Sequence, residues 1–320
     1  MNEKELYKYL VREEAYDASP RNCYAFAKKT DVRDGISLNF GNMAGGFPLA
    51  IGGLTFNNSE SAYIAGLFSD KSEKHQEIQK QLANNTNGLL AKREIRKQNE
   101  AKEIRSDFRT YNIEWMLYVV WCKCVQNPSF RELLLRLPKN AFIIEDCSMR
   151  KGPTATIWGC RNEKLAELIG RKKAELRRVG YGTKAEINSR LDELRLGELS
   201  GYGTFVGQNI MGKILMVCLQ ALRDGTPPAI DLELLQNAHI HILGEELPFT
   251  EVPPCPAVSS VLHQTAAKPT MTFQKGDKVS HQLFGEGIIL TVSHDGTLCQ
   301  VDFSGRTRVL HTGFAKLEKI

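Results

Sequence analysis

The amino-acid sequence predicts an α+β protein built from two parts, on three observations. Residues 111–126 are the most apolar segment, and apolar groups cover nearly the whole circumference of the helix they would form, which is typical of a central, buried helix. Residues 141–145, AFIIE, are short, β-branched and closely bounded, as a buried strand is. Residues 273–320 consist of short alternating runs separated by Gly-Glu-Gly, Asp-Gly and Ser-Gly turns. About five strands at that spacing predict a small antiparallel β-barrel.

The order of these segments suggests three regions along the chain. Residues 1–225 predict one compact domain that begins with a short amphipathic helix. Two polar, charged segments, at roughly 70–107 and 161–200, are helical in composition and are interpreted as solvated insertions into that domain. Residues 226–272 are rich in proline and predict a linker that contains a short helix. The barrel at 273–320 completes the chain.

Composition limits the classes of function. Hydrophobic residues make up 42% of the 320, enough for a substantial core. No run of about 18 apolar residues is present, so no membrane span or membrane partner is expected. The charged N-terminus lacks the apolar run of a secretory signal, which favours a cytoplasmic protein whose eight cysteines are reduced thiols. No Cys-x-x-Cys pair occurs, so we expect no zinc ribbon. No other metal site and no cofactor is expected. The net charge of +5 permits a phosphate-rich partner without requiring one.

Several separated motifs carry the chemistry of the first region. In chain order they are LNFGN (38–42), TFNNSESAY (55–63), WMLYVVWCKCVQNPSFRELLL (115–135), AFIIEDCS (141–148), IWG (157–159) and GQNIMGKILM (207–216). Their order resembles the NADAR family, also called YbiA-like, over roughly residues 35–220. The spacing of Met116 and Lys123 and the last two motifs are the specific parts of this resemblance.

The resemblance implies a compact YbiA-like α+β fold and N-glycosidase chemistry. Family substrates are ribosyl–nitrogen compounds, either riboflavin-pathway intermediates or ADP-ribose attached to guanine bases. It implies three catalytic residues, Glu60, Lys123 and Glu145, and an ADP-ribose-like ligand. The substrate-binding residues it implies are Asn39, Phe40, Asn42, Tyr63, Trp115, Trp158, Gly159, Gly207, Asn209 and Gly212.

These residue types suit the cleavage of an N-glycosidic bond. The transition state develops positive charge on the ribose, which one carboxylate stabilises while a second carboxyl group activates water or protonates the leaving base. Lys123 sits on an otherwise apolar helix, so desolvation should lower its pKa. It would act either as a nucleophile that forms a Schiff base or as a charged group that grips a phosphate. Trp158 or Trp115 could stack on a base, and the start of the helix after Gly207 could hold a phosphate.

The chain departs from the family pattern at several positions. Ile64 and Leu67 occupy the usual places of Gln and Lys, Leu219 that of Arg, and Leu38 that of Ser. Ala155 stands where an Asp commonly precedes Trp-Gly by three residues. This last change keeps open a second interpretation, a catalytically impaired module that senses ADP-ribose or NAD. A scaffold whose pocket is vestigial is the third interpretation.

Asp146, next to Glu145, is a candidate replacement for the missing Asp. Adjacent strand residues face opposite ways, so both acids can point into one pocket only if the strand has already ended.

Two further segments bear on partners. Residues 171–178 hold five basic side chains, which suit either a nucleic-acid backbone or a solvated helix face. Residues 276–290, GDKVSHQLFGEGIIL, and 314–317, FAKL, resemble the Tudor/SH3-like module of superfamily-one repair helicases. That resemblance implies a binding element that contacts nucleic acid or RNA polymerase.

Overall fold

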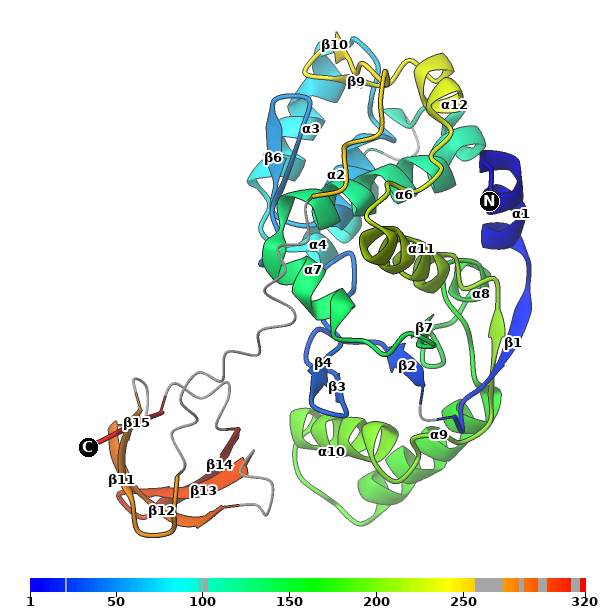
Figure 1. Ribbon diagram of the computed structural model, residues 1–320. Coiled ribbons are helices and arrows are strands. Elements are labelled where there is room, and N and C mark those ends of the chain that lie inside the picture. The colour runs from blue at the N-terminus through cyan, green and yellow to red at the C-terminus, as the bar shows by residue number, and fades with distance from the viewer. Residues whose placement is uncertain are drawn as a thin grey trace. The chain divides into compact units, whose positions relative to one another are not determined.

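The computed structural model describes residues 1–20, 22–97, 99, 103–256, 273–281, 285–292, 298–311 and 317–320. The chain forms two compact units, Met1–Ala257 and Val258–Ile320. Each unit has its own hydrophobic core and its own strands. The first unit mixes helices with short strands, as an α+β fold requires (Figure 1). No helix in the described part of the chain has the length and apolar character needed to cross a membrane.

The core of the first unit is built around α6 (Phe108–Gln126), the apolar helix that the sequence predicts. Helix α6 packs against α2 (Ser59–Ala65), α7 (Pro128–Leu135) and α11 (Ile210–Asp224), so it is covered on several sides. The two tryptophans of this helix, Trp115 and Trp121, are fully buried. Burial all round explains why the segment shows no polar face in the sequence.

The strands of the first unit occur in pairs. The predicted strand is present as β7 (Phe142–Glu145), and it runs parallel to β2 (Cys23–Phe26), with Glu145 opposite Phe26. Helix α11 packs against β7. Further pairs in this unit are β1 (Glu14–Asp17) with β8 (Thr204–Gly207), β3 (Val32–Arg33) with β4 (Ile36–Ser37), and β5 (Leu49–Ile51) with β6 (Leu54–Phe56). Helix α1 (Glu3–Val11) precedes β1, and the short α8 (Thr154–Trp158) follows β7.

The segment at 70–107 is not a solvated excursion. It forms α3 (Glu73–Asn84), α4 (Gly88–Leu90) and the π-helix η1 (Ala91–Arg96), and α2 packs against all three. Gln79 is fully buried and its side chain donates to the carbonyls of Phe68 and His241. Buried polar groups of this kind are satisfied only by tertiary contacts, so polarity along the sequence did not mean exposure.

The segment at 161–200 forms a helical hairpin of α9 (Glu163–Arg178) and α10 (Lys184–Leu196) (Figure 1). A second, smaller core lies beneath the hairpin. Its members include Leu165, Ile169, Ile187, Leu191, Leu194 and Phe205. The insertion therefore carries its own apolar layer, and only the outer helix faces are solvated.

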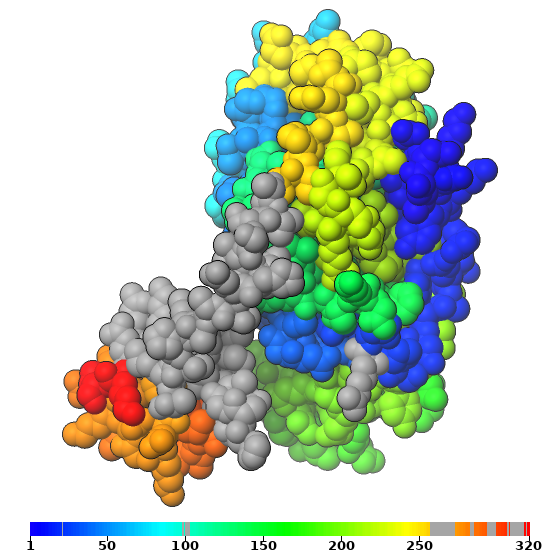
Figure 2. Space-filling model, viewed as in Figure 1, coloured from blue at the N-terminus to red at the C-terminus, as the bar shows by residue number. Residues whose placement is uncertain are grey.

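The prediction that residues 226–272 form a linker is wrong for residues 226–256, which pack on the first unit. They form α12 (Leu232–Asn237), β9 (His241–Ile242) and β10 (Glu245–Glu246). Figure 2 shows this segment, coloured yellow, spread over the surface of the unit. The apolar side chains that it buries in the main core are Ile230, Leu235, Ile240, Ile242, Leu247 and Phe249. Residues 257–272 lie outside the described residues.

The second unit is a five-stranded antiparallel sheet in the order β14-β13-β12-β11-β15. Its strands are β11 (Lys278–His281), β12 (Gly285–Val292), β13 (Leu298–Phe303), β14 (Arg306–His311) and β15 (Leu317–Lys319). Among the described residues no pairing joins β14 to β15, so the sheet is open where the sequence predicted a closed barrel. Val279, Ile289 and Val301 are fully buried in its own small core.

Candidate functional site

Glu60 is held in place by the first turn of α2. Asn58 caps this helix, because its side chain accepts a hydrogen bond from the backbone N–H of Ser61 at 2.9 Å. The N–H of Glu60 donates to the carbonyl of Asn42 at 2.9 Å, and the Ser59 hydroxyl donates to the Asn42 side chain at 3.0 Å. The structure thus brings Asn42 and Glu60 together, as the motif resemblance implies. The Glu60 side chain is only 8% exposed.

Glu145 is positioned by Asn209, the residue before α11. The Asn209 side chain accepts from the Glu145 N–H at 3.1 Å and donates to the carbonyl of Ile143 at 2.8 Å. Asn209 is fully buried and has a left-handed backbone, with φ 54°. Its amide therefore takes the place of a neighbouring strand along β7. Asn209 therefore holds the backbone of Glu145 in place.

The motif glycines allow the backbone to approach this same place. A Cβ at Gly159 would lie 2.4 Å from the Glu145 carbonyl oxygen, and one at Gly212 would lie 2.2 Å from the Ile143 carbonyl oxygen. A Cβ at Gly207 would lie 2.5 Å from the carbonyl oxygen of Gly159. These three glycines pack α11, the Trp-Gly turn and β7 together. Their close contacts are with backbone carbonyl groups, so they hold Glu145 in position.

The two acids, which are far apart in the sequence, converge. Burial raises the pKa of Glu60, the positive charge of Lys92 lowers it, and the negative charge of Glu145 raises it again, with a net rise. Arg96 and Arg150 also act on the Glu60 carboxylate. The hydrogen bonds agree with this: the Asn42 side chain donates to the sulfur of Met211 at 3.2 Å, and Met211 lies two residues after Asn209, which binds the Glu145 backbone. Glu60 and Glu145, here called the acid pair, therefore lie in one region of the fold, and the three cations Lys92, Arg96 and Arg150 act on Glu60.

Each acid also has an ion-pair partner. Lys92 Nζ lies 3.7 Å from Glu60 Oε1, and an Arg150 guanidinium nitrogen lies 2.9 Å from Glu145 Oε1. Sequence reasoning missed both cations, and Arg96 with them. Lys92 and Arg96 lie on η1, inside the segment interpreted as a solvated insertion, and Arg150 lies in the loop after β7. Their basic character was visible in the sequence, but no local pattern connected them to Glu60.

Aromatic side chains border the acid pair. Tyr63 lies one turn after Glu60 on α2, and its ring is 5.5 Å from that of Trp158 at a steep angle. Burial, as the largest cause, raises the pKa of Tyr63, and Glu60 raises it further. Trp158 is half-buried, so part of its surface stays accessible. Of the residues implied as substrate contacts, Asn42 and Asn209 bond to the backbones of Glu60 and Glu145, and Tyr63 lies one helical turn after Glu60.

Lys123 is not brought to the acid pair. Its side chain is fully buried, with Nζ 3.9 Å from the ring centre of Phe130 and 5.2 Å from that of Phe47. Burial lowers its pKa to about 8, and the groups that raise it are the thiols of Cys124 and Cys218 rather than either carboxylate. The predicted fall in pKa is confirmed. The predicted grouping of Lys123 with Glu60 and Glu145 is wrong, because Lys123 lies between aromatic rings and cysteines, away from both acids.

Trp115 and Phe40 also differ from their expected role. Trp115 is fully buried, stacks on Tyr118 and donates its indole N–H to the Tyr63 carbonyl at 3.2 Å. Phe40 is fully buried against Phe26. Both side chains fill the core that supports the site, so neither is open to a ligand. Asn39 is half-buried, and its side-chain oxygen has no hydrogen-bond partner within the described part of the chain.

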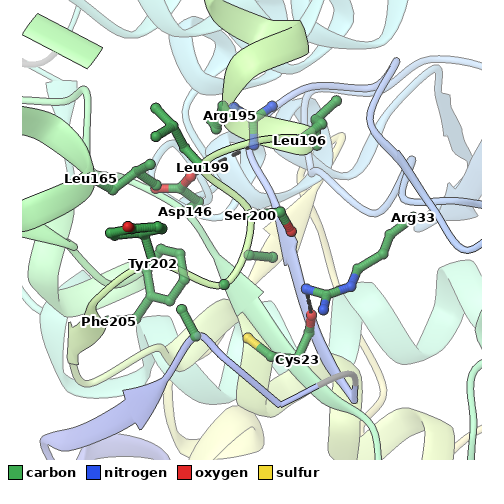
Figure 3. A pocket seen from close by; sticks show the side chains of 13 residues that line it. Cys23, Arg33, Asp146, Leu165, Arg195, Leu196, Leu199, Ser200, Tyr202 and Phe205 are labelled. Carbon is green, nitrogen blue, oxygen red and sulfur yellow. Dashed lines mark hydrogen bonds and ion pairs between the residues drawn. The ribbon is translucent and has the colours of Figure 1, made fainter. Parts of the chain in front are cut away.

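Asp146 faces away from Glu145, as strand alternation predicts. It lies 3.6 Å from Arg195 of α10, and Arg195 also pairs with the buried Asp31 at 2.6 Å. Figure 3 shows Asp146 and Arg195 at a cavity that Cys23, Phe205 and other residues line. The cavity measures about 30 Å³, which is room for a water molecule and not for a nucleoside. Asp146 therefore does not replace the Asp that the family pattern has at position 155.

Comparisons with known proteins add little to this geometry. No protein-family model matches the chain, and no curated protein matches it. A solved structure with similarity to the chain is the NMR structure of YbiA from E. coli, at 23% sequence identity and a TM-score of 0.34. The match covers 43% of this chain and 72% of the YbiA chain. At that score the likeness carries no argument. Across the described residues no cluster of three or more His, Cys, Asp or Glu could hold a metal ion.

Proposed function

We propose that this protein is an N-glycosidase that hydrolyses a ribosyl–nitrogen bond, with ADP-ribose on a modified base as the substrate that the motif resemblance favours. The observation that carries the proposal is that hydrogen bonds of Asn42 and Asn209 hold Glu60 of α2 and Glu145 of β7 in one region of the fold. A buried acid pair whose members have different surroundings is the arrangement that general acid–base cleavage of a glycosidic bond needs.

The surroundings assign a role to each acid. The raised pKa of Glu60 favours its protonated form, so Glu60 is the general acid. Glu145, paired with Arg150, is the carboxylate that stabilises the sugar cation and accepts a proton from water. The C1′–N bond breaks and its electron pair goes to nitrogen, which takes the proton of Glu60. Water adds to C1′ and gives a proton to Glu145, so one water is consumed.

The aromatic border suits the leaving base. Trp158 is half-buried beside Tyr63, one helical turn from Glu60, and an exposed indole face can stack on a base by about 1–3 kcal/mol. Arg150 lies in the loop that follows β7, where its guanidinium pairs with Glu145. A substrate that combines a base, a ribose and phosphates is consistent with these neighbours.

The test is hydrolysis of ADP-ribosylated guanosine, followed by chromatography of released ADP-ribose. We expect Glu60→Gln and Glu145→Gln each to lose roughly 10²–10³-fold in rate, the usual effect of removing one catalytic electrostatic group. Glu132→Gln, which changes an exposed acid on α7, is the matched control and should keep the wild-type rate. Full activity in Glu60→Gln would end the proposal.

A sensor of ADP-ribose or NAD is the second candidate, and one observation favours it. Position 155 is a small, buried Ala instead of an Asp, so this position supplies no carboxylate. Binding of ADP-ribose measured by calorimetry, together with no hydrolysis by the wild type, would support the sensor. Contact of residues 273–320 with nucleic acid or polymerase is proposed on motif resemblance alone, and it is checked by binding of that unit to single-stranded DNA.

A further inference from the structure

Two cations cover the acid pair from the solvent side. The side chains of Lys92 and Arg150 are 44% and 48% exposed, whereas those of the carboxylates they pair with, Glu60 and Glu145, are 8% and 14% exposed. Each pair therefore has an inner acid and an outer base. An approaching ligand would meet the ammonium and guanidinium groups before it met either acid.

The cations come from two separate elements. Lys92 lies on the π-helix η1, which packs against α2, and Arg150 lies in the loop that follows β7. π-Helical turns occur frequently at functional sites, because they displace side chains from regular helical positions. Convergence of two unrelated segments on one acid pair is a tertiary feature. Neither segment belongs to the six motifs that carry the family resemblance.

We propose that Lys92 and Arg150 form a phosphate clamp, in which both cations exchange their carboxylate partners for phosphate groups of the substrate. Opening the Lys92–Glu60 pair leaves a buried carboxylate without its cation, and protonation of Glu60 relieves that cost. A phosphate offers more negative charge and bidentate geometry to a guanidinium. The clamp makes phosphate groups a requirement of the substrate, and in this respect it rests on the proposed function for the role of the acids.

Exchange has a consequence for the proton on Glu60. The charged and titratable groups that act on it are Lys92 and Arg96 from η1, Glu145 from β7, Arg150 from the loop and Tyr63 from α2. When two of the cations turn to phosphate, Glu60 is left beside Glu145 and a further anion. Like charges favour the neutral acid, so Glu60 takes up a proton as the ligand binds. Binding of a phosphate-bearing ligand therefore increases the fraction of Glu60 that is protonated and can act as the general acid.

The experiment is calorimetric titration of the full chain with ADP-ribose. We expect Lys92→Gln and Arg150→Gln each to weaken binding about 10-fold or more, because each removes a charge-assisted contact of about 1.5–3 kcal/mol. Lys151→Gln is the matched control, an exposed cation next to Arg150, and should bind as the wild type does. Thermal unfolding of all variants verifies that they fold. Unchanged affinity in both clamp variants, or equal weakening in Lys151→Gln, overturns the clamp, as does failure of the wild type to bind.

Proton uptake tests the exchange itself. Titrations near pH 7 in two buffers of different ionisation enthalpy should show uptake of up to one proton by the wild type and none by Glu60→Gln. Absence of uptake in the wild type overturns the exchange. The glycosidase proposal fails by a different result. If the wild type binds ADP-ribose through Lys92 and Arg150 but does not hydrolyse the substrate, the catalytic role of the acids is wrong and the clamp stands.

Discussion

Lys123 shows how a single buried charge can shape the stability of this protein. Its ammonium group lies over the faces of Phe130 and Phe47, and within the described residues no hydrogen-bond acceptor meets Nζ. An aromatic face gives only part of what water gives to an ammonium group, so the charged form is disfavoured. The sequence already indicated this unfavourable charge, because Lys123 is an isolated lysine on an apolar helix. The packing of α7 and of the loop at Phe47 decided which groups surround it.

We predict that Lys123→Met stabilises the protein at neutral pH. The folded pKa is about 8, below the ordinary 10.5, so the folded state binds this proton less tightly than the unfolded state. The stability of the wild type should therefore rise by about 3 kcal/mol between pH 8 and pH 10.5, and be lowest below pH 8. The variant should lack this rise. Urea unfolding at pH 7 and pH 10 measures it, and parallel pH dependences of the two proteins would contradict the prediction.

At the scale of elements, the contact between α11 and β7 determines where Glu145 lies. The GQNIMGKILM motif suggested a helix start that could hold a phosphate, and the structure uses its glycine and asparagine for backbone contact instead. The same motif supplies Lys213, whose buried ammonium donates to the carbonyls of Tyr9 and Arg12 at the end of α1. The motif thus positions Glu145, the proposed proton acceptor, through backbone contacts.

Gly212→Ala tests this contact. The added Cβ would lie 2.2 Å from a backbone carbonyl oxygen, so α11 must move away from β7. We expect a loss of about 1–3 kcal/mol in stability, the usual cost of overpacking, and reduced hydrolysis because Glu145 moves. Gly170→Ala is the control, since this exposed glycine of α9 has open space around it and should gain roughly 1 kcal/mol. Equal thermal midpoints for the two variants would show that α11 and β7 do not need this close approach.

At the scale of the whole molecule, the first unit includes a proline-containing segment whose composition is typical of a linker but which packs into the core. Residues 226–256 lack a long periodic pattern, yet they close the main core next to α6 and α3. Glu114 of α6 accepts the N–H of Asp231 at 2.7 Å, and Gln79 of α3 holds both sides of β9 through His241 and Leu243. Proline excludes regular helix and sheet, but it does not exclude burial.

Truncation distinguishes a linker from a part of the core. A chain of residues 1–257 should unfold cooperatively, with nearly the thermal midpoint that this unit has in the full chain. A chain of residues 1–225 should not fold, because burial of a large apolar side chain contributes about 1.5–3 kcal/mol and several such side chains would be lost. Their sum is comparable with the whole stability of a typical domain. Circular dichroism melting compares the two, and a cooperative transition in the shorter chain would refute the prediction.

The sequence by itself determined the elements whose pattern is local. Helix α6 and strand β7 were predictable because their apolar side chains are contiguous, and the alternation along β7 separated Glu145 from Asp146. The tertiary structure alone decided that Glu60 meets Glu145, that Lys92 and Arg150 cover them and that Lys123 stands apart. Periodicity reports which side of an element is buried, whereas the distance between side chains on different elements depends on how those elements pack, and no local pattern encodes it.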